Sequence, residues 1–171
     1  MANHYEADPM LIPELTDSIL AHVQAIPPPC PQSRIVPMDG LAPSLPQLPR
    51  ELIAAIMRHL SPFSDAPKEC SFLVSPSYWL QTLLECSLIP WLWDLDTEAI
   101  LRKEQSKSKG QEWNWELLIR RMAQNDIYES KKVTWAMENV PLGLRNRKRI
   151  WGLIQDIFVE EVSARDLEAG P

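Results

Sequence analysis

The chain has 171 residues, of which 45% are hydrophobic and 23% are charged, and its formal net charge is -6. These values are ordinary for one soluble globular domain. No stretch approaches the ~18 uninterrupted apolar residues of a membrane-spanning helix, so we expect no membrane association. The N-terminus has no basic stretch followed by an apolar one, so we expect no secretory signal and a cytoplasmic or nuclear location.

Residues that carry chemistry are few and scattered. The three cysteines are widely separated and form no Cys-x-x-Cys pair, which favours a reducing compartment and idle thiols. The three histidines are equally dispersed, and the five glycines form no phosphate-binding loop. We therefore predict no catalytic residues, no metal site and no cofactor, and a protein that is not an enzyme.

Proline dominates the first part of the chain, because ten of its sixteen prolines lie within the first fifty residues. Each proline fixes its own φ and discourages helix in the residue before it. The segment between 13 and 25 nevertheless has apolar residues at helical spacing. Residues 1–44 are therefore predicted to be a Pro-rich extension, partly disordered, with one short helix.

The clearest predicted helix spans residues 48–60. Its apolar residues recur every three or four positions and occupy one contiguous arc of the helix. Pro49 stands where an initial helical residue belongs, and Ser61-Pro62 ends the pattern. The arc contains Leu48, Leu52, Ile53, Ile56, Met57 and Leu60.

The rest of the chain predicts further short helices and no strands. We expect at most a short helix over residues 68–74, then helices over 78–86, from 90 to 101, over 113–122, over 133–137 and over 144–162. Alternating apolar residues and glycine turns, which would indicate strands, are missing. The predicted fold is all-α, an irregular bundle of five to seven short helices over residues 45–163, followed by a frayed tail over 164–171.

The run Leu48-Pro49-Arg50-Glu51-Leu52-Ile53, with Ile56, Met57 and Leu60 following, resembles the opening of an F-box. The resemblance covers about residues 45–93. It implies a protein–protein interaction module that binds a Skp-type adaptor of an SCF ubiquitin ligase and delivers an unknown protein client. The residues implied to bind the adaptor are Leu48, Pro49, Leu52, Ile53, Ile56, Met57 and Leu60.

Tryptophan-containing motifs in the second half carry a further resemblance. The runs from Pro90 to Asp96, from Trp113 to Leu118 and from Pro141 to Arg147 resemble F-box-like proteins of filamentous fungi, which implies no particular chemistry. Tryptophan is favoured both in cores and at binding hot spots. The seven tryptophans are therefore either mainly core or partly a client surface, for which the candidates are Trp91, Trp93, Trp113 and Trp115.

Two other interpretations stay open at this point. The apolar arc of residues 48–60 is equally suited to the core of a self-contained helical domain with no link to ubiquitin. The basic run 145–149 is also compatible with a nuclear or nucleic-acid-associated factor. We do not expect nucleic-acid binding, because the chain is acidic overall and no aromatic residues interleave the run.

Overall fold

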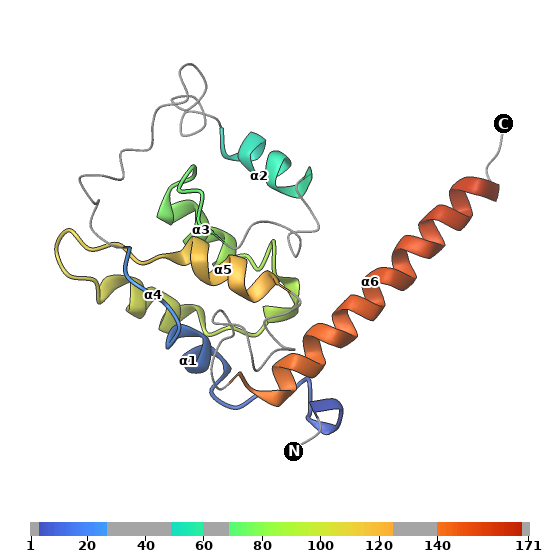
Figure 1. Cartoon of the computed structure of the whole chain (residues 1–171), viewed down its shortest axis with the longest axis horizontal. Coiled ribbons are helices and arrows are strands. Elements are labelled where there is room, and N and C mark those ends of the chain that lie inside the picture. Colours follow the sequence, from blue (N-terminus) through green and yellow to red (C-terminus); the bar gives the residue numbers. More distant parts are fainter. Residues whose placement is uncertain (1–3, 27–48, 60–68, 125–139, 169–171) are drawn as a thin grey trace. The chain divides into compact units, whose positions relative to one another are not determined.

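The computed structural model describes residues 4–26, 49–59, 69–124 and 140–168, and within these ranges it is all-α, as predicted (Figure 1). No strand occurs in these ranges, although Ala25 and Trp113 form one isolated antiparallel bridge. The elements are η1 (His4–Glu6), α1 (Leu15–Leu20), α2 (Arg50–His59), α3 (Pro76–Leu84), η4 (Pro90–Leu92), α4 (Thr97–Gln105), α5 (Trp115–Ala123) and α6 (Leu142–Glu168).

The chain divides into two compact units. The first consists of Met1–Leu15 and Asn139–Pro171, and the second is Thr16–Glu138. These boundaries differ from the predicted ranges 1–44, 45–163 and 164–171, because the two ends of the chain associate with each other. Hydropathy along the sequence gives no sign of such a pairing between segments more than 130 residues apart.

In the first unit, the start of α6 holds the N-terminal segment through its polar side chains. Asn146 Nδ2 donates to the carbonyl oxygen of Ala7 at 2.9 Å. Arg147 donates to the carbonyl oxygens of Pro9, at 2.5 Å, and Met10, at 3.1 Å. Side-chain donors thus satisfy carbonyls of a segment that lies outside regular secondary structure, which lets its backbone pack closely on a helix.

In the second unit, α3 and α5 pack against each other (Figure 1). Their facing residues are apolar and spaced three or four apart, so that each helix buries one stripe. The side chains of both helices that are almost wholly buried are Trp79, Leu83, Trp115, Leu118, Ile119 and Met122. Backbone hydrogen bonds from Ile26 to Glu112 and from Asn114 to Gln24 fix the segment after α1 beside the start of α5.

Side-chain caps set the starts of three helices. Ser75 caps α3, whose first residue is Pro76, Asp96 caps α4, and Asn114 caps α5. In each helix the side-chain oxygen accepts a hydrogen bond from a backbone N–H that has no partner within the helix. Caps of this kind explain why such short helices have definite boundaries.

Glycine is scarce in this chain, and within the described ranges three residues other than glycine adopt the left-handed backbone region. These are Glu14, Phe72 and Cys86, with φ values of 54°, 51° and 50°. Cys86 lies just after α3, where its N–H donates to Leu83 and the N–H of Ser87 donates to Thr82. This is the Schellman arrangement, in which the left-handed position is usually glycine.

Residues 69–74, where we expected at most a short helix, form none, because the backbone N–H groups of Ser71 and Phe72 donate to a side chain on α5. Helix α6 continues to Glu168, past the predicted start of a frayed tail. The helix expected over 133–137 lies outside the described residues.

Gly143 and Gly152 on α6 offer a first test of the packing in the first unit. A Cβ on Gly143 would collide with the backbone carbonyl oxygen of Asp8, whereas a Cβ on Gly152 would meet no atom within 4 Å. Gly143→Ala should therefore lower the free energy of unfolding by about 1–3 kcal/mol. Gly152→Ala, the control, should raise it by about 0.5–1 kcal/mol through helix propensity. Urea denaturation of both variants measures these changes in the free energy of unfolding. Equal changes in the two variants would contradict the close contact between Gly143 and Asp8.

Candidate binding site

On helix α2, the predicted adaptor-binding arc has one buried edge and one exposed edge. Leu52 and Ile56 are exposed, with 51% and 41% of their surface accessible, whereas Ile53 and Met57 are buried. Residues four apart lie on the same side of a helix, so each pair marks one edge of the arc. Pro49 is exposed immediately before the helix, and Leu48 and Leu60 lie outside the described residues. The helix is thus anchored along one edge and leaves the other free.

The four tryptophans predicted as a client surface do not form one surface. Trp91 and Trp115 are buried in the core, which corrects their assignment to an exposed site. Trp93 is exposed, and Trp113 is half-buried. A large apolar ring gains most when it is removed from water, and the core of this phenylalanine-poor chain uses tryptophan for that purpose.

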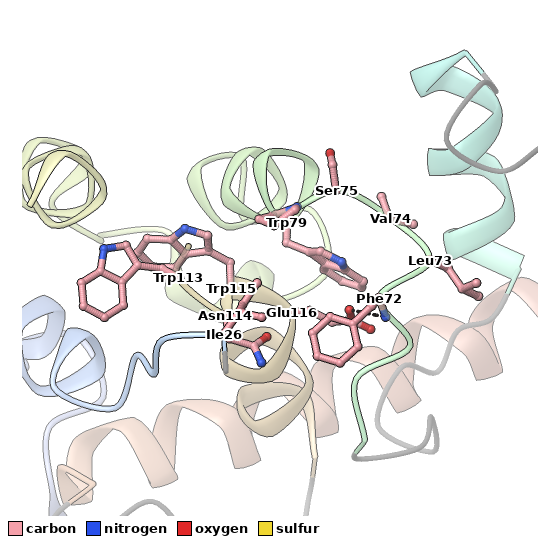
Figure 2. A pocket seen from close by; sticks show the side chains of 11 residues that line it. Ile26, Phe72, Leu73, Val74, Ser75, Trp79, Trp113, Asn114, Trp115 and Glu116 are labelled. Carbon is pink, nitrogen blue, oxygen red and sulfur yellow. Dashed lines mark hydrogen bonds between the residues drawn. The ribbon is translucent and has the colours of Figure 1, made fainter. Parts of the chain in front are cut away.

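Three tryptophans instead line a cavity of about 330 Å³ in the second unit (Figure 2). Trp113 and Trp115 form one side, and Trp79 and Phe72 form the other. The remaining lining residues are Ile26, Leu73, Val74, Ser75, Pro76, Asn114 and Glu116. A concave, mainly apolar site with a few polar groups is the usual form of a ligand-binding pocket, and this volume is near the lower end of the usual range.

Hydrogen bonds to α4 orient the two rings on the first side. The indole nitrogen of Trp113 donates to the carbonyl oxygen of Lys103 at 2.9 Å, and that of Trp115 donates to Glu104 Oε2 at 3.0 Å. The ammonium of Lys103 also lies 4.4 Å from the centre of the Trp113 ring, which is cation–π geometry. Both indoles are therefore held by polar contacts, so the wall that they form is rigid.

The opposite side of the cavity is held by the buried carboxylate of Glu116. Its Oε1 accepts from the N–H and the hydroxyl of Ser71 at 2.7 and 2.8 Å. Its Oε2 accepts from the N–H of Phe72 at 3.0 Å (Figure 2). Arg120 donates to Oε1 at 2.8 Å, and its guanidinium lies 5.7 Å from the Trp79 ring. A buried charge needs this degree of compensation. The network holds Phe72 in its left-handed conformation, with half of its side chain exposed at the rim.

Asn114 contributes one of the polar groups that line the cavity. The residue is only 6% exposed, and its Oδ1 accepts from the N–H of Leu117 at 2.9 Å and from the thiol of Cys70 at 3.4 Å. Because the cap requires an acceptor, these contacts assign the oxygen and therefore the nitrogen of the amide.

Sequence reasoning missed this cavity and its polar residues. Two local signals were present: Asn114 stands directly before a helical pattern, and Glu116 and Arg120 have the spacing of a helical ion pair. Neither signal shows that the carboxylate also binds residues 71 and 72. The cavity depends on that long-range contact, which no local pattern encodes.

The basic run 145–149 is largely engaged within the first unit. Asn146, Arg147 and Lys148 are buried, and Arg149 stacks on Tyr5 at 4.9 Å while donating to Asn146 Oδ1. Burial lowers the pKa of Lys148 to about 7. An electrostatic nucleic-acid surface presents its cations to solvent, so these contacts favour a structural role for the run.

The second half of α6 presents a different feature, an exposed apolar face. It consists of Leu153, Ile154, Ile157 and Phe158. An exposed cluster of large apolar residues is typical of interaction sites.

The described residues contain no group of three or more potential metal-binding side chains. Burial raises the pKa of the thiols of Cys70 and Cys86, which lowers their reactivity as thiolates. Among the helices of these same ranges, none combines the length and apolar character needed to cross a membrane. Comparison with protein-family models, curated proteins and solved structures found no significant match.

The Glu116–Arg120 pair gives a test of how the cavity is held. Glu116→Ala leaves the buried guanidinium and the N–H groups of Ser71 and Phe72 without their acceptor, and should lower the free energy of unfolding by about 3 kcal/mol. Glu98→Ala is the control, because Glu98 and Arg102 form an exposed pair at 3.7 Å. That change should cost no more than about 0.5 kcal/mol. Chemical denaturation measures both, and a small effect at Glu116 would contradict the network.

Lys148 predicts a pH dependence of stability. Its pKa is about 7 in the folded protein, against an ordinary value of 10.5. Between these values the unfolded chain binds a proton that the folded chain lacks, so the free energy of unfolding should rise with pH across this window. Lys148→Met should therefore stabilise the protein by about 2 kcal/mol at pH 6.5, and by less as the pH approaches 10.

Urea denaturation at pH 6.5 and pH 9.5 measures this effect. The control is Lys109→Met at an exposed lysine, which should change the free energy of unfolding little at either pH. A stabilisation by Lys148→Met that is the same at both pH values would show that the amine stays charged in the folded protein.

Proposed function

We propose that this chain is an F-box-like protein–protein interaction module that uses α2 to bind a Skp-type adaptor. The observation that supports the proposal most directly is the exposure of Leu52 and Ile56 beside the buried residues Ile53 and Met57. A helix that leaves one apolar edge in water has surface available for a partner. If the whole arc were core, all four side chains would be covered.

The physical basis is the packing of a helix into a groove. An amphipathic helix that enters an apolar groove on another protein is anchored by residues three or four positions apart. Leu52 and Ile56 have this spacing, and Pro49 fixes the direction in which the chain enters the helix. Anchors of this kind commonly carry most of the binding energy of an interface.

The proposed mechanism is proximity. The chain would hold a protein client close to a ligase, and bond chemistry would take place on other subunits of that assembly. This agrees with the residues of the site, because an apolar helix edge offers surface and supplies neither a nucleophile nor an acid–base pair. Any client would bind elsewhere on the chain.

The test is co-purification with a Skp-type adaptor. The double variant Leu52→Asp, Ile56→Asp introduces two charges into the proposed interface and should lower the amount of adaptor recovered more than tenfold. Both positions are exposed, so the variant should remain folded, which circular dichroism checks.

Leu101→Asp is the matched control, because Leu101 is as exposed as Ile56 but lies on α4. It should leave adaptor recovery unchanged. If the wild-type chain recovers no adaptor, or if the double variant recovers as much as the wild type, α2 is not an adaptor-binding helix and its arc serves this domain alone.

A further inference from the structure

The second half of α6 carries four large apolar side chains that are exposed. Their accessible fractions lie between 39% and 62%, and their spacing places them on one side of the helix. They are Leu153, Ile154, Ile157 and Phe158, here called the α6 face. An exposed apolar cluster of this kind is suited to contact with another protein.

The contacts of α6 within its own unit end before the α6 face begins. Asn146 and Arg147 hold the N-terminal segment, and Arg149 stacks on Tyr5. The two ends of the chain are the only segments of the first unit. A helix gains most of its stability from the packing of its apolar side. The described residues of the first unit leave the α6 face without such packing.

The charges along α6 follow the order that is unfavourable for a single helix. The first eight residues, 142–149, include four basic residues and no acidic one. The last nine, 160–168, include four acidic residues and one basic residue. A helix dipole favours acidic residues at the start and basic residues at the end. A neighbouring helix with the reverse order of charge would compensate for this arrangement.

A second α6 in the antiparallel direction has that reverse order. In a pair related by a two-fold axis, the start of each helix lies beside the end of the other, and each surface contacts its own copy. Basic residues of one chain then lie beside acidic residues of the other, and the two helix dipoles are antiparallel. A parallel pair would place like charges side by side. The helix is therefore complementary to itself in the antiparallel direction only.

The α6 face lies between the two charged parts, where the two-fold axis of such a pair would cross. Leu153 follows Arg149 by four positions, and Ile157 precedes Glu160 by three. Arg149 and Glu160 are eleven positions apart, which is close to three turns, so both positions lie on one side of the helix. An axis at the centre of the α6 face brings Arg149, which is exposed, near Glu160 of a second copy.

We propose that α6 forms an antiparallel two-helix interface with the α6 of a second copy of this chain. The α6 face is the apolar centre of the interface, and Arg149 pairs with Glu160 of the other copy on either side of it. The order of charge selects this occupant, because it matches the helix to its own reverse. The inference is independent of α2 and of any adaptor.

Sedimentation equilibrium of the full chain tests the association. Two faces of four residues make a small interface, so the Kd of the dimer should be on the order of 10–100 µM. Ile157→Glu places a charge at the centre of the interface in both copies and should raise this Kd at least about thirtyfold. Phe158→Gln, which adds no charge and is a good helix former, should raise it at least about tenfold. This second variant keeps the test decisive if Ile157→Glu perturbs the helix.

Two control variants change exposed apolar residues elsewhere. The double variant Leu52→Asp, Ile56→Asp on α2 and the single variant Leu101→Asp on α4 should leave the Kd of the dimer unchanged. The α2 variant also separates this test from adaptor binding, since the dimer should persist in it whether or not an adaptor is recovered.

A charge change tests the direction of the pair. Glu160→Lys replaces the attraction to Arg149 of the second copy by repulsion at two symmetric contacts, so it should raise the Kd about fivefold at low salt and less at 0.5 M salt. Glu98→Lys is the matched control, because it alters the net charge equally at an exposed position on α4. It should leave the Kd equal or slightly lower, since the acidic chains repel each other less.

Three results would overturn the inference. The first is a wild-type chain that stays monomeric up to about 1 mM, which would leave the α6 face to a different partner. The second is a dimer whose Kd is unchanged by Ile157→Glu and Phe158→Gln. The third is a Kd that Glu160→Lys leaves unchanged or lowers, which would indicate a parallel pair or an interface without this charge contact.

Discussion

The carboxylate of Glu116 accepts hydrogen bonds from two backbone N–H groups, a hydroxyl and a guanidinium while it lies almost wholly out of water. The contacts with Ser71 and Phe72 join α5 to another part of the second unit, whereas Arg120 lies on α5 itself. The bonds to Ser71 and Phe72 fix the segment before α3, and the guanidinium of Arg120 lies near the ring of Trp79 on α3 itself. A buried charge tolerates few alternative arrangements, because any rearrangement leaves it unpaired. One acidic side chain therefore fixes the wall of the cavity.

The exposed edge of α2 and the cavity beside α5 are built on different physical principles. The exposed edge of α2 is an apolar surface on a single helix, for which the shape of the interface would come largely from the partner. The cavity has its shape before any ligand arrives, since both of its sides are held by hydrogen bonds to neighbouring elements. Preorganisation of this kind lowers the entropic cost of binding. The exposed edge of α2 and the lining of the cavity have no residue in common.

The sequence predicted the helices better than it predicted the sites. Helix α2 follows from an apolar arc that Pro49 begins, and α5 follows from apolar residues at helical spacing. The same pattern shows that Leu52 and Ile53 are both apolar and does not show that only Ile53 is covered. Trp115 and Trp93 are likewise the same residue type in similar surroundings, yet one is core and the other is exposed. Tertiary contacts decide these outcomes, and the contact of Glu116 with Ser71 spans 45 positions.

The scarcity of glycine has a consequence for how this protein can change. Glu14 and Cys86 turn corners in a backbone region that is costly for any residue with a Cβ atom. The architecture tolerates both, so its present stability lies below what the same fold can reach. Substitution of Glu14 or Cys86 by glycine would relieve this cost and stabilise the fold. Neither position lies on the exposed edge of α2 or in the lining of the cavity. Such a reserve would let the binding residues accept harmful changes, and so acquire new partners, before the scaffold fails.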